Sequence, residues 1–127
     1  MDLSGRQNLE ILAEVRNQLT PADLDHWLDY FDLSQVQDQK VRTYSLGMRQ
    51  RLGLIQAFME EPDLLLLDEP LNALDSDMAD KVKAYLKGFL ADGKTLVMTS
   101  HHKEDFGDLP LASLYLDAGR IKERSCV

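Results

Sequence analysis

The sequence predicts an α/β fold in which a helical first half precedes an incomplete parallel sheet and a C-terminal hairpin. Three observations indicate it. Apolar residues recur at helical spacing before residue 60, two short aliphatic runs flank a further helical segment, and the tail has two short runs separated by an Ala-Gly pair. We expect a helical subdomain at residues 1–60 and an α/β core at residues 61–127.

The composition is that of one soluble globular domain, or of two small lobes that share a core. The chain has 127 residues, of which 44% are hydrophobic and 28% charged. Its longest purely aliphatic run, Leu64 to Leu67, is far too short to span a membrane, and its first residues do not resemble a secretory signal. The lone Cys126 is typical of an incidental thiol in a reducing compartment. We therefore expect a cytoplasmic protein.

The charge argues against nucleic acid as a partner. The net charge is −8, with 14 Lys and Arg against 22 Asp and Glu, and both halves are acidic. A surface that binds a duplex needs a basic stripe. We therefore expect no nucleic-acid partner.

Two helices are predicted before residue 34. The first covers Gly5 to Leu19, and the second opens at Thr20, with Pro21 in its first turn and Asp23 completing a capping-box pair. We expect Trp27 to belong to the core rather than to a ligand site, because it lies at helical spacing among leucines. The predicted inner faces are Leu9, Leu12, Val15 and Leu19 for the first helix, and Leu24, Trp27, Leu28 and Phe31 for the second.

A polar segment, Ser34 to Arg42, lacks periodicity and is predicted as a loop. A third helix follows from Ser45 to about Glu61, with Ser45 as its cap.

The character of the sequence changes after Pro62. Residues 63–67 form a short aliphatic run that is typical of a parallel strand buried on both faces, and Thr95 to Ser100 form a second one. The amphipathic helix predicted between them, Asp75 to Leu90, makes a βαβ crossover. A hairpin is expected from Ser113 to Arg124. The helix should turn inward Met78, Val82, Tyr85, Leu86, Phe89 and Leu90.

The stretch GFLADGKT, residues 88–95, fits the phosphate-loop pattern letter for letter. A phosphate loop needs a strand before it and a helix after its Lys. Here a helix ends near Gly88, Gly93 lies in the turn, and Lys94 leads into a strand. We interpret this stretch as a glycine-ended helix, not as a phosphate site.

The sequence LLLLDEP, residues 64–70, places Asp68 and Glu69 directly after a buried strand, at the sheet edge where open α/β folds bind ligands. Asp68 suits Mg²⁺ coordination, directly or through water, and Glu69 could orient a water for attack on a phosphoryl group. The plainer alternative is an acidic loop after a strand.

Two further stretches have functional alternatives to a structural role. Ser45 and Gly47 open the third helix, where free N–H groups can bind an anion, although alone Ser45 would be a simple cap. His101 and His102 follow the second strand beside Asp68 and Glu69, where a His could donate to a γ-phosphate. A metal site at this His pair lacks a suitably spaced third ligand.

Together these pieces resemble the ATP-binding domain of ABC transporters. YSLGMRQR, residues 44–51, resembles the family's signature motif in the form found in drug and peptide exporters. LLLLDEP resembles its Walker B strand, and His101 its switch histidine. The order and spacing of the motifs also fit the family. The D-loop would be Asn72, Ala73, Leu74 and Asp75.

The resemblance implies a partial P-loop NTPase fold, that of an ABC ATPase, with ATP and Mg²⁺ as cofactors. Glu69 and His101 would be catalytic in cis, Asp68 would hold Mg²⁺ through water, and the D-loop would lie at the seam of a head-to-tail dimer with a second ABC ATPase domain. A transmembrane permease subunit is the other implied partner. The signature residues that would bind nucleotide in trans are Ser45, Leu46, Gly47 and Met48.

The resemblance covers only the later half of the family domain, without Walker A and the Q-loop. We therefore expect the isolated chain to bind ATP weakly and not to turn it over. An apolar sheet edge and face should be uncovered, and a complementing N-terminal half would cover them. The first hypothesis is the C-terminal half of an exporter ATPase. The alternatives are an interaction partner that offers its signature in trans to a complete ATPase, and a soluble ABC ATPase without a transport role.

Overall fold

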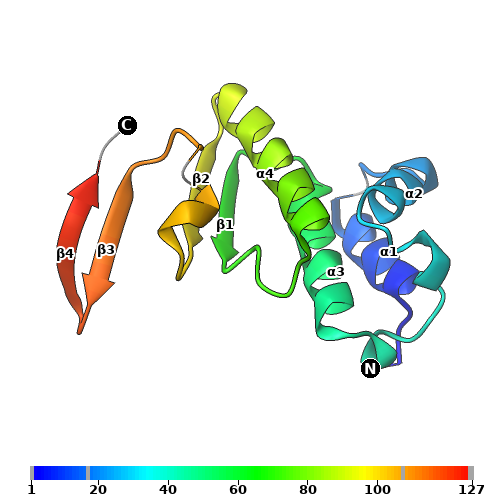
Figure 1. Cartoon of the computed structure of the whole chain (residues 1–127). Helices are drawn as coiled ribbons and strands as arrows, with labels where there is room; N and C mark the ends of the chain where they lie inside the picture. Colours follow the sequence, from blue (N-terminus) through cyan, green and yellow to red (C-terminus); the bar gives the residue numbers. More distant parts are fainter. Residues whose placement is uncertain (1, 17, 107, 126–127) are drawn as a thin grey trace.

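The computed structural model describes residues 2–16, 18–106 and 108–125. Helices occupy one end of the molecule, a two-stranded sheet lies beside them, and a hairpin forms the other end (Figure 1). The elements in chain order are α1 (Gly5–Arg16), α2 (Pro21–Tyr30), the 3₁₀ turns η1 (Ser34–Val36) and η2 (Val41–Thr43), α3 (Leu46–Phe58), β1 (Leu64–Asp68), α4 (Ser76–Ala91), β2 (Thr95–Thr99), the 3₁₀ turn η3 (Lys103–Phe106), β3 (Ser113–Asp117) and β4 (Arg120–Ser125).

Side-chain caps start three of the helices, and two of these caps, Thr20 and Ser45, are those that the sequence predicts. Thr20 accepts from the N–H of Asp23, whose carboxylate accepts in return from the N–H of Thr20, so the capping box is confirmed. Ser45 caps α3 and Asp75 caps α4, each accepting from the backbone N–H three residues on. Helix α4 thus begins at Ser76, one residue later than predicted.

The predicted inner face of α1 is wrong in part. Leu9 and Ala13 are buried, whereas Leu12 is 37% exposed and Val15 79% exposed. Leu9 and Ala13, four residues apart, mark the packed side of α1. Val15 is six residues from Leu9 and lies away from that side, and Leu12 lies at its margin. The helix ends at Arg16 rather than Leu19.

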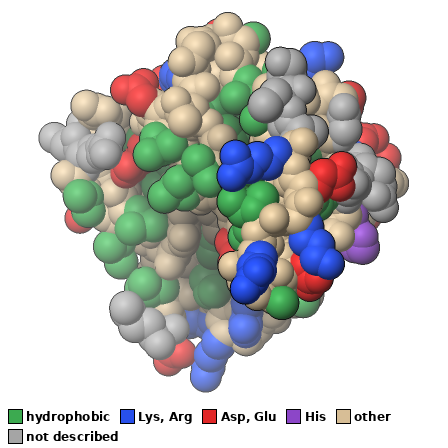
Figure 2. All heavy atoms as spheres, turned by 90° about the vertical axis from the view of Figure 1, so that its left-hand side faces the viewer, with side chains coloured by type: hydrophobic (Ala, Val, Ile, Leu, Met, Phe, Trp, Pro, Cys, Tyr) green, Lys and Arg blue, Asp and Glu red, His purple; other side chains and the backbone are tan. Residues whose placement is uncertain are grey.

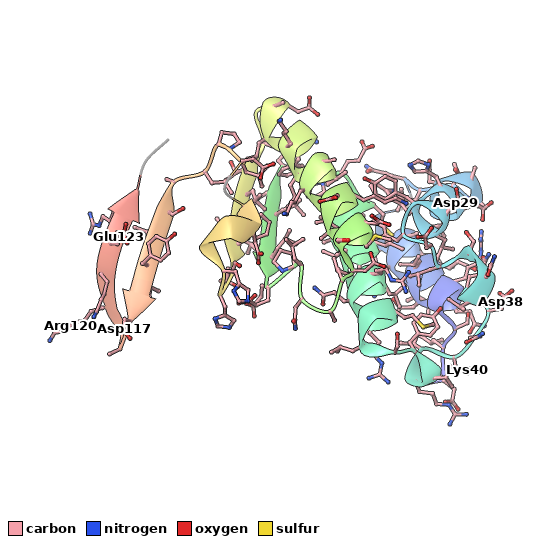
Figure 3. The ribbon with its side chains drawn as sticks, viewed as in Figure 1. Asp29, Asp38, Lys40, Asp117, Arg120 and Glu123 are labelled. Atoms are coloured by element: carbon pink, nitrogen blue, oxygen red, sulfur yellow. The ribbon has the colours of Figure 1, made fainter. Side chains whose placement is uncertain are left out.

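The segment predicted as a plain loop contains η1 and η2 and packs against α1. The Tyr44 hydroxyl donates to the carbonyl of Val36 at 2.7 Å. Ser4 and Lys40 form an isolated antiparallel bridge, and the Lys40 ammonium donates to the carbonyl of Asp2, beside the N-terminus (Figure 3). Backbone N–H groups at the start of α1 also donate to carbonyls of this segment, which holds it against the helix.

An aromatic cluster joins the helical half to α4. Tyr85 stacks on Phe58 with ring centroids 4.2 Å apart, and Trp27 meets the edge of Tyr85 at 5.6 Å. The prediction that Trp27 is a core residue is confirmed. Tyr30 and Lys81 also exchange hydrogen bonds with each other's backbone carbonyls. The core is continuous across residue 60, and the division into subdomains at that point stays a prediction.

Strands β1 and β2 pair in parallel, in a register that sets Asp68 beside Thr99. The prediction that these strands are buried on both faces is wrong. Leu65 and Leu67 are buried against the helices, but Leu64 and Leu66 are 51% and 69% exposed. Within the described residues each strand has a neighbour on one side only, as the expectation of an uncovered edge and face requires.

Figure 2 looks onto this end of the molecule and shows hydrophobic side chains gathered there. The exposed large hydrophobic residues of the four strands are Leu64, Leu66, Val97, Leu114, Leu116 and Ile121.

The interpretation of GFLADGKT as a helix end is confirmed. Gly88 lies inside α4, and Gly93 has a φ of 81° in the left-handed region. The N–H groups of Gly93 and Lys94 donate to the carbonyls of Leu90 and Phe89, the bond pair of a Schellman cap. Thr95 then starts β2. The backbone N–H groups of this turn therefore cap the C-terminal end of α4.

The hairpin turns through Ala118 and Gly119, whose φ values of 50° and 77° are both positive. Two such residues make the tight turn that matches the twist of paired strands. Asp117 and Arg120 face each other across this turn (Figure 3).

Among the described residues no helix is both long and apolar enough to cross a membrane.

Candidate functional site

The carboxyl ends of β1 and β2 bring the predicted acids together with a threonine. The Thr99 hydroxyl donates to the Asp68 carboxylate and accepts from the N–H of Glu69 at 3.0 Å. One side chain on β2 thus ties together two consecutive residues at the end of β1. The prediction that the end of β2 lies beside Asp68 and Glu69 is confirmed by the parallel register.

Glu69 and His101 are in direct contact. The Nε2 atom of His101 lies 3.1 Å from Oε1 of Glu69, while the imidazole is 86% exposed. Ser100 shapes the turn before the histidines, because its hydroxyl donates to Asp105 and accepts from the N–H of His102. The contact leaves His101 accessible to a ligand that approaches Glu69 from solvent.

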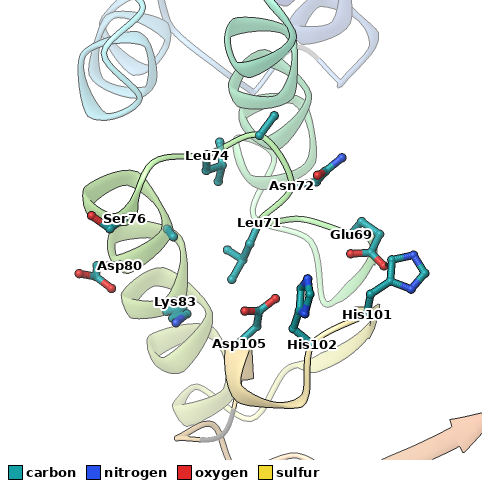
Figure 4. A pocket seen from close by; sticks show the side chains of 12 residues that line it. Glu69, Leu71, Asn72, Leu74, Ser76, Asp80, Lys83, His101, His102 and Asp105 are labelled. Atoms are coloured by element: carbon teal, nitrogen blue, oxygen red, sulfur yellow. The ribbon is translucent and has the colours of Figure 1, made fainter.

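Beyond Glu69 the chain forms the wall of an open pocket of about 510 Å³. His101 points at Glu69, while His102 and Asp105 point toward the middle of the pocket (Figure 4). The predicted D-loop supplies Asn72, Ala73 and Leu74 to the lining, and Asp75 instead caps α4. The other lining residues include Leu71, Ser76, Asp80 and Lys83.

The predicted signature residues form the first turn of α3. The Ser45 hydroxyl accepts from the N–H of Met48 at 3.2 Å, and the first backbone bond of the turn runs from Arg49 to the carbonyl of Ser45. The N–H groups of Leu46 and Gly47 precede that first bond, which is the arrangement of a helix N-terminus. Leu46 projects outward and is 68% exposed.

The signature turn packs on the predicted D-loop. A Cβ placed on Gly47 would lie 2.9 Å from the carbonyl oxygen of Ala73. Further along α3, the Gln50 amide donates to the carbonyls of Glu69 and Pro70. Sequence patterns alone indicate no role for Gln50 or for the Thr99 hydroxyl, because their bonds depend on strand register and loop path.

The residues present fit Mg²⁺ as a cofactor held mainly by its nucleotide. No group of three metal-ligating side chains occurs among the residues that the structure describes. Mg²⁺ in nucleotide sites keeps several waters and takes one or two carboxylates beside the phosphates. Asp68, an exposed carboxylate fixed by Thr99, can supply one such contact.

Comparison with known proteins decides the family. Residues 3–72 match the sequence profile of the ABC transporter family. The chain belongs to the ABC transporter family. The resemblance seen in the motifs is therefore confirmed over more than half of the chain.

This ABC chain has relatives that are named as ATP-binding proteins. It is 38% identical to an uncharacterized ABC transporter ATP-binding protein, YybJ of Bacillus subtilis, over 91% of the chain and 53% of the relative. It is 36% identical to the bacitracin transport ATP-binding protein BcrA of Enterococcus faecalis, over 80% of the chain and 33% of the relative. For the daunorubicin resistance ATP-binding protein DrrA3 of Streptomyces coeruleorubidus, identity is 34% and coverage 94% and 39%. The chain spans about half or less of the length of these relatives.

A solved structure confirms the fold. The ATP-binding cassette MJ0796, a dimer in a post-hydrolysis state bound to ADP and Pi, superposes with a TM-score of 0.83 at 25% identity. The match covers 98% of the ABC chain and 56% of that protein. The chain therefore has the fold of part of an ABC ATPase.

Proposed function

We propose that the chain is the signature- and Walker B-bearing part of an ABC transporter ATP-binding subunit that couples ATP binding and hydrolysis to export. One observation carries this proposal. Asp68, Glu69 and His101 meet at the carboxyl edge of a parallel sheet, with Thr99 and His101 in contact with the two acids. The names of BcrA and DrrA3 support export of a drug or peptide as the transport class.

In this proposal each residue has one task at the γ-phosphate. Glu69 would orient the attacking water, and His101, which lies against the Glu69 carboxylate, would donate to a γ-phosphate oxygen. Asp68 would hold Mg²⁺ through a water, and the ion would neutralise charge on the phosphates. Because phosphoryl transfer depends mainly on position and charge, the fixed geometry at the strand ends supports these roles.

The signature turn would serve a second ATP-binding domain. The N–H groups of Leu46 and Gly47 form a helix N-terminus, which suits the γ-phosphate of an ATP held by the other subunit of a head-to-tail dimer. Ser45 and Met48 would shape the same turn. Asn72, Ala73, Leu74 and Asp75 would lie along the seam of that dimer. The dimeric state of the MJ0796 cassette supports such an assembly.

Two further partners belong to the proposal. A transmembrane permease subunit would place the assembled protein at the inner face of a membrane. An N-terminal half with Walker A would cover the face formed by Leu64, Leu66 and Val97, which are about half or more exposed. The relatives' greater length supports such a half.

A role in ATP hydrolysis can be tested apart from an interaction role by joining the chain to an N-terminal half. In a YybJ chimera, the N-terminal portion of YybJ would precede this chain. We expect no Mg-ATP hydrolysis by the chain alone, hydrolysis by the chimera, and loss of at least about 10²-fold in the chimera with Glu69→Gln. A chimera that binds Mg-ATP but hydrolyses it no faster than its Glu69→Gln variant would contradict the proposal. Activation of a complete ABC ATPase by the isolated chain would favour the interaction alternative.

A further inference from the structure

The Gln50 side chain links the signature helix to the catalytic glutamate. Gln50 lies on α3, half-buried, and its Nε2 donates to the carbonyl of Glu69 at 3.2 Å and to that of Pro70 at 3.0 Å. A primary amide has two N–H donors, so one side chain can satisfy both carbonyls. These are consecutive carbonyls of the turn that carries Glu69 away from β1.

That turn has a backbone that needs support. Glu69 and Ala73 have φ values of 50° and 63°, in the left-handed region that non-glycine residues rarely adopt. Such conformations persist where the surroundings determine them. Inside the turn, the N–H of Asn72 donates to the carbonyl of Glu69 and that of Leu74 to the carbonyl of Leu71. Gln50 adds two bonds from outside the turn.

A second contact from the same face of α3 meets the other end of the turn. The Cα of Gly47 lies under the carbonyl of Ala73, close enough that a Cβ would be 2.9 Å from its oxygen. Gly47 and Gln50 are three residues apart, so they share one face of the helix. The first two turns of α3 therefore hold the Glu69 end and the Ala73 end together.

The backbone of Glu69 is thus held from both sides. Its N–H donates to the Thr99 hydroxyl on β2, and its carbonyl accepts from Gln50 on α3. With both peptide groups fixed, the Glu69 side chain leaves the backbone in a set direction, where it meets His101 at 3.1 Å. This is the geometry that hydrolysis would require.

We propose that Gln50 is a positioning residue that fixes Glu69 for hydrolysis and makes the signature turn and the D-loop move as one unit. The inference rests on the proposed function for its catalytic part only. A displacement of the signature by ATP in a partner domain would then be passed through two hydrogen bonds, one to the Glu69 carbonyl and one to the Pro70 carbonyl. The chemistry required at position 50 is a pair of N–H donors, not bulk.

The link itself can be tested in the chain without nucleotide. Amide exchange measured by NMR at Asn72 and Leu74 reports opening of the turn. We expect it to quicken roughly tenfold in Gln50→Ala and in Gln50→Glu, because each variant loses two hydrogen bonds to the turn. The control is Gln56→Ala, a glutamine on the same helix that contacts Asn8 instead, and it should leave both amides unchanged.

Gln50→Glu decides between donation and packing, since it keeps the size of the side chain and removes the donors. Unchanged exchange in Gln50→Glu with faster exchange in Gln50→Ala would mean a packing role and would overturn the proposal. Equal exchange in all variants would do the same. If Gln50→Ala does not fold, Gln50→Lys, which keeps a donor, should retain slow exchange, and Gln50→Glu should not.

The catalytic part is tested in the YybJ chimera. We expect Gln50→Glu to lower kcat roughly tenfold with KM for ATP unchanged, and Gln56→Ala to change neither. A raised KM with an unchanged kcat would overturn the positioning role. Should the unmodified chimera be inert, the proposed function fails, while the exchange experiment alone decides whether Gln50 holds the turn.

Discussion

The residues at the strand ends show that a sequence motif can identify the side chains of a site but not the hydrogen bonds that hold them. Asp68, Glu69 and His101 could be predicted as a group, because each lies at or just after the end of a strand and parallel strands end at one edge. Thr99 holds the two acids, but the sequence does not state which β2 residue faces Asp68. The supporting hydrogen bonds depend on a register that only the fold sets.

Two glycines of α3 provide the sharpest test of the packing on the D-loop. A Cβ at Gly47 would lie 2.9 Å from the backbone oxygen of Ala73, whereas one at Gly53 meets nothing within 4 Å. Both variants gain about 1 kcal/mol of helix propensity, but Gly47→Ala must also displace backbone, which costs about 1–3 kcal/mol. Urea unfolding should show Gly53→Ala stabilised and Gly47→Ala lower by that difference. Equal stabilities would mean that the loop moves freely.

Buried tyrosines predict a loss of stability in alkali. Burial raises the pKa of Tyr30, Tyr44 and Tyr85 above the ordinary value of 10.0. Above about pH 10 the unfolded chain releases these protons while the folded one keeps them, so unfolding becomes easier. Their contribution is complete below the unfolded pKa and is lost as the pH rises through the folded one.

Tyr85→Phe should lessen this loss, since it removes an ionisable group and keeps the ring that stacks on Phe58. Urea unfolding at about pH 8 and about pH 11, on either side of the ordinary tyrosine pKa, gives the fall in free energy for parent and variant. We expect the smaller fall in Tyr85→Phe. An identical fall in both proteins would place the alkaline sensitivity elsewhere.

At the scale of elements, capping chemistry predicted the helices well, and burial was predicted less well. Thr20 and Ser45 could be predicted as caps because a side-chain oxygen three residues before a free N–H is a local feature. The inner face of α1 and the two-sided burial of β1 depend on which partners lie nearby. The local sequence does not show which elements those partners are.

The two glycines of GFLADGKT should respond in opposite ways to alanine. Gly88 lies in α4 with open space around it, so Gly88→Ala should stabilise the chain by about 0.5–1 kcal/mol. Gly93 has a φ of 81° and ends the helix, so Gly93→Ala should cost about 1–2 kcal/mol. Thermal unfolding of both variants measures the difference. Two destabilised variants would contradict the helix-end interpretation.

At the scale of the whole molecule, the sheet separates a packed face from an open one. Leu65 is 3% exposed and Leu66, the next residue, is 69% exposed. Leu64, Leu66 and Val97 form an apolar surface on the two strands that carry Asp68 and Thr99. Contiguous apolar surface of this kind indicates an interface. The catalytic edge and the open face therefore belong to the same two strands.

A charged side chain on this open face should lower the free energy of unfolding only when another segment covers the face. In the chain alone, Leu66→Glu should change the free energy of unfolding by no more than about 0.5 kcal/mol, because the side chain meets water. It should also reduce self-association in sedimentation velocity, since a charge disfavours pairing of sheet faces. Leu65→Ala, on the packed face, should cost about 2–5 kcal/mol.

In the YybJ chimera the same Leu66→Glu should cost about 3–5 kcal/mol, because an unpaired carboxylate would then be buried. The comparison isolates the covering segment, since the substitution and the strand are identical in both proteins. Urea unfolding of the chain and of the chimera, each with and without Leu66→Glu, completes a thermodynamic cycle. Equal costs in the two proteins would show that the supplied half leaves this face open, and the sheet would then need a different partner.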